Sequence, residues 1–242
     1  MNSPILTQPR PPSYTEVVVR DGHPVPQSLT YLDSLSEVKV LQKLDEYEAL
    51  YLKTLFERRN SYYIADENER VFFFAKEVTE PLSRLCCNSR ALEIHIVDDY
   101  GVTLMILRRP LRCTSSCWWC CCLQDVEIES PMGIVRSYVR EKWTPWWSAM
   151  DVVHPEGEVL YNIRGLCCTC RLRCHNSLQV FEAKSKVKVA SYHKYCKSCT
   201  DFVGGLNDFS IKFHEEITAE DKLLLLGAGF IVDLVYLEYR SY

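Results

Sequence analysis

The sequence predicts a mainly β fold, an antiparallel barrel or sandwich, over most of its length. From about residue 60, short runs recur that are apolar or alternate apolar with polar residues, as buried or half-buried strands do. The runs are rich in Val, Ile, Tyr and Phe, and Gly, Pro, Asn and Asp punctuate them. No alternation of strand and helix patterns indicates a parallel sheet. The runs are 61–67, 70–77, 92–99, 101–109, 125–130, 133–143, 158–163, 178–184, 186–194 and 209–213.

Length and composition are those of an ordinary globular protein. The 242 residues suit one sizeable domain, or one domain with a tail, and 47% of them are hydrophobic and 25% charged. The formal net charge is −4, whereas nucleic-acid-binding proteins usually carry a basic excess or a basic face. We therefore expect no nucleic-acid partner.

Residues 1–27 read as a flexible, proline-rich tail, and residues 28–242 as the folded domain. The tail holds six of the eleven prolines. Within it, Pro11, Pro12 and Tyr14 form a Pro-Pro-x-Tyr motif. A polyproline II turn of this kind docks on aromatic grooves such as those of WW-type or SH3-type domains. A proline-rich tail without a dedicated partner is the alternative.

The segment 29–50 is expected to form a helix that packs on the domain. Apolar residues recur in it at steps of three, which gives an apolar stripe that drifts around a helix. They are Leu29, Leu32, Leu35, Val38, Leu41 and Leu44.

The terminal segment Leu223–Glu238 is strongly apolar and permits two interpretations, a membrane anchor or a core helix. Its sixteen residues would span roughly 24 Å as a helix, short of the hydrocarbon thickness of about 30 Å. Asp233 also opposes insertion. A core helix is therefore favoured, in which Gly227 and Gly229 allow close approach of strands and Asp233 has a hydrogen-bond partner near a barrel mouth.

Sequence signatures of catalysis are not found. The chain has no phosphate-binding glycine loop, no His-Glu-x-x-His and no Gly-x-Ser-x-Gly motif. Its six histidines are scattered, and no nucleophile pairs with a base. A catalytic function is not expected, and a redox role for the cysteines is disfavoured with it.

Thirteen cysteines are many for this length. Residues 1–30 contain no apolar signal region, so we expect the thiols to stay reduced rather than to form a disulfide framework. Zinc is one alternative, because three C-x-x-C pairs occur and two pairs can make a tetrahedral site. Inert buried thiols are another, above all for Cys167 and Cys168. The three pairs are Cys117 with Cys120, Cys167 with Cys170 and Cys196 with Cys199.

The run 113–122 favours a different chemistry. Five of its ten residues are cysteine, and Trp118 and Trp119 interrupt them. Tryptophan prefers the membrane interface, and three arginines just upstream suit anionic lipid. Cysteines in this setting fit reversible S-acylation, and stable anchoring takes more than one signal. The candidate palmitoylation sites are Cys117, Cys120, Cys121 and Cys122.

These features together resemble the phospholipid scramblase family. The resemblance covers roughly residues 29–242, and the proline-rich tail is similar too. The matching stretches are RRPLRC at 108–113 with the cysteine run, CCLQDVEIESP at 121–131, CCTC at 167–170, FSIKF at 209–213 and the terminal GAGFIVDLVYLE.

The resemblance implies a Tubby-like fold, a closed twelve-stranded antiparallel β-barrel around one hydrophobic C-terminal helix. It implies covalent palmitate on the cysteine run and attachment to the cytoplasmic face of the plasma membrane. The activity it implies is calcium-dependent, bidirectional movement of phospholipids between leaflets without ATP. A lipid-anchored adaptor or signalling protein without transport is the second hypothesis, and a zinc-stabilised β domain the third.

The implied calcium loop matches residues 205–216 and departs from the family pattern. Asn207, Asp208 and Glu216 could supply the hard oxygen ligands that calcium prefers. Gly205 replaces the leading aspartate of the family, and Lys212 and His214 are poor neighbours for a cation. The sequence therefore predicts weak calcium binding at most.

Overall fold

The computed structural model describes residues 18–20, 23–25, 27–42, 61–78, 91–110, 123–131, 136–144, 147–165, 177–194 and 208–237. All statements on structure below concern these residues.

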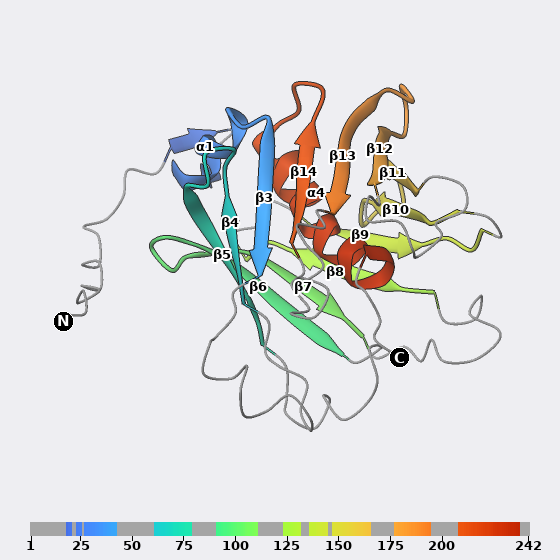
Figure 1. Ribbon diagram of the computed structural model, residues 1–242, viewed down its shortest axis with the longest axis horizontal. Coiled ribbons are helices and arrows are strands. Elements are labelled where there is room, and N and C mark those ends of the chain that lie inside the picture. Colours follow the sequence, from blue (N-terminus) through green and yellow to red (C-terminus); the bar gives the residue numbers. More distant parts are fainter. Residues whose placement is uncertain are drawn as a thin grey trace, which may run out of the picture.

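Strands β3 to β14 close into one antiparallel barrel (Figure 1), which decides between barrel and sandwich. Each strand pairs with its neighbours in the chain, and β14 pairs back onto β3. Every run predicted as a strand contributes one. The strands are β3 (Glu37–Gln42), β4 (Ser61–Ala65), β5 (Val71–Glu77), β6 (Leu92–Asp98), β7 (Thr103–Arg109), β8 (Asp125–Glu129), β9 (Arg136–Glu141), β10 (Ala149–Val153), β11 (Val159–Gly165), β12 (Ser177–Glu182), β13 (Lys188–Lys194) and β14 (Phe209–Phe213).

Because the strands run up and down in chain order, the barrel has two distinct ends. The short-turn end carries tight turns such as the one that joins β4 to β5 and the one that joins β6 to β7. At the other end, called here the long-connection end, the odd-numbered strands from β3 to β13 finish and the even-numbered strands from β4 to β14 begin. The connections at this end include 43–60, 110–124 and 195–208.

Aspartates shape two of the short turns. The side chain of Asp66 accepts hydrogen bonds from the backbone N–H groups of Asn68 and Arg70, at 2.8 and 2.9 Å. Asp98 does the same for Tyr100 and for Val102, at 3.0 and 2.9 Å. These carboxylates satisfy backbone donors that the turn leaves free, so the turns are tight.

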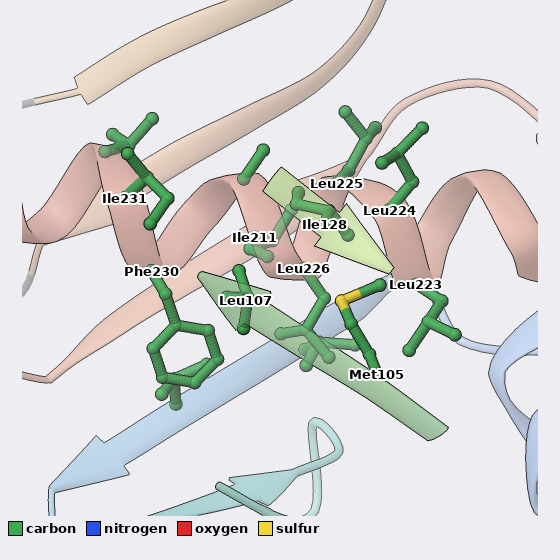
Figure 2. Close-up of a cluster of buried hydrophobic side chains, with 14 of the residues drawn as sticks. Met105, Leu107, Ile128, Ile211, Leu223, Leu224, Leu225, Leu226, Phe230 and Ile231 are labelled. Carbon is green, nitrogen blue, oxygen red and sulfur yellow. The ribbon is translucent and has the colours of Figure 1, made fainter. Parts of the chain in front are cut away.

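Helix α4 (Ala219–Val232) runs inside the barrel from the short-turn end to the long-connection end, and the π-helix η3 (Asp233–Leu237) continues it (Figure 1). Thr218 caps its first turn by accepting a hydrogen bond from the N–H of Asp221. From Leu223 to Asp233 every residue is buried. The segment is therefore a core helix, as the sequence favoured, and Figure 2 shows its leucines among side chains of the barrel wall.

Two glycines let α4 approach opposite parts of that wall. A Cβ at Gly227 would come within 2.6 Å of the sulfur of Met105 on β7. A Cβ at Gly229 would lie 3.0 Å from both the Phe209 and the Tyr192 rings, on β14 and β13. The predicted role of both glycines in close packing is confirmed.

An N-terminal element covers the short-turn end. Helix α1 (Gln27–Asp33) precedes β3, and the buried Lys222 of α4 donates from Nζ to the carbonyl oxygens of Leu32, Asp33 and Leu35, at 3.2, 2.7 and 2.9 Å. A lysine in this position neutralises the carbonyl end of α1 and ties it to the core helix.

The region predicted as a tail contains a small hairpin. Strands β1 (Val18–Arg20) and β2 (His23–Val25) pair with each other. Residues 1–17, with Pro11, Pro12 and Tyr14, lie outside the described residues.

The helix predicted over 29–50 is wrong in its extent. Helix α1 ends at Asp33, and residues from Glu37 onward form β3. Leu29 and Leu32 do pack from the helix, but Val38 and Val40 point inward from a strand. Apolar residues spaced three apart on a helix and two apart on a strand fall on the same positions here and there in the sequence. The apolar repeat therefore hid the change from helix to strand.

The outer surface of β6 to β9 carries charges in pairs. Arg108 on β7 lies between Glu129, at 2.6 Å, and Glu93, at 3.5 Å. Arg136 on β9 lies 3.5 Å from Glu127 on β8. Such cross-strand pairs on exposed side chains indicate a wall whose outer face contacts water while its inner face packs on α4.

Candidate functional site

A buried ion pair closes the long-connection end around the terminal helix. Nζ of Lys194, the last residue of β13, donates to Oδ1 of Asp233 at 3.0 Å, and their side chains are only 6% and 2% exposed. Burial raises the pKa of the Asp233 carboxyl, and the charge of Asp208 adds to that rise, while Lys194 opposes it. The expected partner of Asp233 near the barrel mouth is thus a lysine.

A second contact fixes the helix end to the hairpin between β9 and β10. The Tyr236 hydroxyl lies 3.0 Å from Oε1 of Glu141 and 3.2 Å from the carbonyl oxygen of Ala149. Burial, and then the charge of Glu141, raises the pKa of the Tyr236 phenol. The last turn of the core helix is therefore attached to two sides of the barrel mouth.

Two of the three predicted calcium ligands, Asp208 and Glu216, lie beyond opposite ends of β14. Oδ1 of Asp208 accepts the backbone N–H of Gln42 at 2.9 Å, so this carboxylate already joins β14 to β3. Glu216 lies beyond the other end of β14, a strand of five residues that spans roughly 16 Å by the rise of an extended chain. One ion cannot bind both carboxylates. Asn207 lies outside the described residues, and within them no group of three His, Cys, Asp or Glu side chains could hold a metal ion.

The predicted acylation and zinc sites lie in the sequence between strands that are described. The candidates Cys117, Cys120, Cys121 and Cys122 lie outside the described residues, as do all thirteen cysteines. The strands that flank each cysteine in the sequence nevertheless begin or finish at the long-connection end. The same is true of all five tryptophans.

A tryptophan hairpin at this end is a candidate site that the sequence analysis missed. Between β9 and β10, Trp143 is 54% and Trp147 44% exposed. The N–H of Lys142 donates to the carbonyl oxygen of Ala149 at 2.8 Å, and the Thr144 hydroxyl donates to the carbonyl oxygen of Trp147. A signal existed in KWTPWW at 142–147, where three tryptophans surround a proline.

Two histidines share one serine hydroxyl on the outside of β13 and β14. Oγ of Ser191 lies 2.8 Å from Nε2 of His193 and 2.9 Å from Nε2 of His214. Burial and the nearby charges of Lys188 and Lys212 hold the pKa of both imidazoles below its usual value. The cluster therefore disfavours a further positive charge.

No helix among the described residues combines the length and hydropathy that crossing a membrane requires.

The fold and its site define a class of protein, an antiparallel barrel that its own terminal helix fills and that a buried ion pair closes around the end of this helix. The scramblase family model matches residues 18–239, and the chain belongs to that family.

Several curated proteins are similar to the chain. It is 31% identical to mouse phospholipid scramblase 1 over 98% of the chain and 72% of that relative. It is 31% identical to human phospholipid scramblase 1 over 88% of the chain and 66% of the relative. Human phospholipid scramblase family member 5 is 28% identical over 97% of the chain and 84% of the relative. The chain thus spans about two thirds to four fifths of these relatives. No solved structure matches it.

Proposed function

We propose that the protein is a membrane-associated phospholipid scramblase, which moves phospholipids in both directions between leaflets without ATP. The observation that carries this proposal is the match of the scramblase family model to residues 18–239, because this range includes the whole barrel and the core helix. Relatives named phospholipid scramblases align over the same region. The proposed activity makes and breaks no covalent bond, so the protein is not an enzyme in this proposal.

The packing of the barrel restricts how lipid could move. The lumen is filled by α4, whose side chains contact inward residues such as Met105, Leu107 and Ile128 (Figure 2). A phospholipid headgroup therefore has no path through the described part of the barrel. In this proposal the barrel lies at the bilayer surface and lowers the barrier by perturbing the lipid packing beneath it.

Attachment to the cytoplasmic face of the plasma membrane would come from palmitate on Cys117, Cys120, Cys121 and Cys122. Their flanking strands β7 and β8 have their ends at the long-connection end of the barrel. Each buried methylene of an acyl chain contributes about 0.8 kcal/mol, and two chains anchor a protein stably where one does not. The barrel would then be held with this end toward the bilayer.

Calcium is proposed at most as a weak activator. The separation of Asp208 from Glu216 by β14 leaves neither the ligand count nor the geometry of a tight site.

The proline-rich tail is proposed as a partner motif for WW-type or SH3-type domains, through Pro11, Pro12 and Tyr14. Binding of a WW domain to the wild-type chain, lost on Tyr14→Ala, would support it. Equal binding by the variant would contradict it.

Reconstitution tests the proposed activity. Purified full-length protein is inserted into liposomes with fluorescent phospholipid in both leaflets, and a membrane-impermeant reductant bleaches the outer leaflet. We expect bleaching to proceed past the half that protein-free liposomes show, without ATP, and to increase with protein density. Bleaching that stops at half at every density, with and without calcium, would contradict the proposal.

The second candidate is a lipid-anchored adaptor that binds membranes without moving lipid. The filled lumen favours it, because the barrel offers binding surfaces but no internal path. Membrane binding without bleaching beyond half in the same liposomes would select this candidate.

A further inference from the structure

We propose that the hairpin between β9 and β10 is a second, non-covalent membrane-contact site, in which Trp143 and Trp147 insert into the headgroup region of a phospholipid bilayer. The inference rests on the proposed function only in placing the protein at a membrane. It adds a contact that needs no acyl group, and it fixes which end of the barrel faces the lipid.

The exposure of the two rings is the first observation. Tryptophan is among the more buried residue types on average, yet Trp143 is 54% and Trp147 44% exposed. An indole has a large apolar body and one N–H donor, which suits the boundary between headgroups and acyl chains better than bulk water.

The hairpin presents the rings from a rigid base. Its two sides are joined by the hydrogen bond from Lys142 to Ala149, and the N–H of Gly165 donates to the carbonyl oxygen of Ser148 at 2.8 Å. All five residues of β10 are buried. Little conformational freedom of the backbone at this base remains to be lost on insertion, which favours binding.

The surroundings of the rings favour lipid over a protein partner. The exposed cations Lys142 and Arg164 flank the hairpin, where they could contact lipid phosphates, although Lys142 also pairs with Asp151. A stable protein interface buries about 1,200 Å² or more in total, and two half-exposed rings supply a small part of that. A membrane contact needs less, because a second signal such as acylation can add to it.

The position of the hairpin agrees with this assignment. It lies at the long-connection end, where the strands that flank every cysteine in the sequence also begin or finish. Insertion of the rings and acylation of the cysteine run would therefore act on the same side of the barrel.

The test uses the full-length protein after hydroxylamine has removed any thioester-linked acyl groups. Binding to phosphatidylcholine vesicles, with and without phosphatidylserine, is measured by flotation for the wild type and for Trp143→Ser/Trp147→Ser. A matched control is Tyr100→Ser/Val187→Ser, because these side chains are 49% and 43% exposed at the short-turn end. Thermal unfolding confirms that all three proteins are folded.

We expect the tryptophan variant to lose roughly tenfold to hundredfold in partition coefficient, as the burial of two half-exposed aromatic side chains implies. The control variant should bind like the wild type. Lipids brominated in the acyl chain should quench part of the wild-type tryptophan fluorescence, and this part should shrink in the tryptophan variant.

Three outcomes would overturn the inference. They are no vesicle binding by the deacylated wild type, equal binding by the tryptophan variant, and an oligomer in lipid-free solution that the tryptophan variant dissociates. The bleaching assay on the same vesicles separates the two proposals. Tryptophan-dependent binding without scrambling contradicts only the proposed function, and scrambling with unchanged binding of the variant contradicts only this inference.

Discussion

At the scale of single residues, the pair of Lys194 and Asp233 has the largest predictable effect on stability. Both side chains are buried, and each is the charge partner of the other. Replacing Lys194 by Met leaves a carboxylate buried without its cation, which typically costs about 3–5 kcal/mol. Urea denaturation should show this loss in the free energy of unfolding.

The double variant Lys194→Met/Asp233→Leu is the control for that measurement. With both charges removed, apolar packing replaces the pair, and most of the lost stability should return. A single variant that loses less than about 1 kcal/mol, or a double variant as unstable as the single one, would contradict a strong buried pair.

A second residue-scale prediction concerns pH. The pKa values of His193 and His214 in the folded protein lie below the ordinary value of 6.5. The unfolded chain therefore binds protons first as the pH falls, and stability decreases with pH from about 6.5 downward. We expect the melting temperature to fall between pH 7.5 and 5.5. The double variant His193→Gln/His214→Gln should show a smaller fall.

Two nearby carboxylates favour the protonated form of these imidazoles and so oppose the lowering of their pKa. Glu37 raises the pKa of His193, and Glu215 raises that of His214, but burial outweighs both. A pH dependence that is the same in the wild type and in the glutamine variant would show that other groups control it.

At the scale of elements, the contact of α4 with the barrel wall gives a sharp prediction. Gly229 faces the Phe209 and Tyr192 rings, with no room for a larger side chain. Gly229→Val should overpack this contact and destabilise the domain by about 1–3 kcal/mol, or more if the rings cannot shift. The change is measured by thermal unfolding.

Gly157→Val is the comparison variant, because no atom lies within 4 Å of a Cβ at this position. Its loss of stability would come only from the positive φ of 93°. Partial relief of the Gly229→Val defect by Phe209→Leu, with no relief of Gly157→Val, would locate the defect in packing. Equal effects on both variants would contradict that explanation.

The length of β14 gives the prediction for calcium. Because the strand separates Asp208 from Glu216, we expect dissociation constants no tighter than about 10⁻⁴–10⁻³ M, the range of weak sites. Titration calorimetry on the wild type and on Asp208→Ala checks it. Micromolar binding that Asp208→Ala abolishes would show the prediction to be wrong.

The elements also show what the sequence could and could not predict. Strands with one face inward were predictable, because their burial alternates, as in β6 and β12. Strand β10 was missed because all five of its residues are buried, so its pattern has no period of two. Strand β3 was read as part of a helix because its apolar residues continue the repeat of α1.

The candidate site was less predictable than the fold, since it depends on contacts between distant residues. The apolar context of Asp233 required a partner, but nothing near Lys194 in the sequence identified it as that partner. Asp208 and Glu216 are close in the sequence, yet a strand holds them apart. Exposure of Trp143 and Trp147 could be known only once the hairpin was placed.

At the scale of the whole molecule, the orientation at the membrane can be tested through the cysteine run. Replacing Cys117, Cys120, Cys121 and Cys122 with Ser should move the protein in cells from the membrane fraction toward the soluble fraction. The reason is that loss of several acyl chains removes most of the anchoring free energy. Fractionation and acyl-exchange labelling measure the two effects.

Cys196→Ser/Cys199→Ser provides the control, because these cysteines follow β13, which finishes at the long-connection end, and lie outside the run. This variant should fractionate like the wild type. Unchanged fractionation of the fourfold variant, or no thioester-linked acyl group on the wild type, would contradict anchoring through the run. If the wild type and the fourfold variant bind zinc and the control variant does not, a metal site that includes Cys196 and Cys199 is supported.

The closure of β14 on β3 and the filling of the lumen by α4 also have a consequence for biosynthesis. Strand β3 leaves the ribosome early, but β14, which closes the barrel onto it, and the helix that fills the barrel are made roughly 170–190 residues later, which takes about 10–40 s at usual rates of translation. Until then the nascent chain has open sheet edges and an unfilled apolar interior, both of which invite aggregation. Chaperones that bind nascent chains would therefore be needed for most of its synthesis, and a premature stop codon anywhere before α4 would leave no stable fragment.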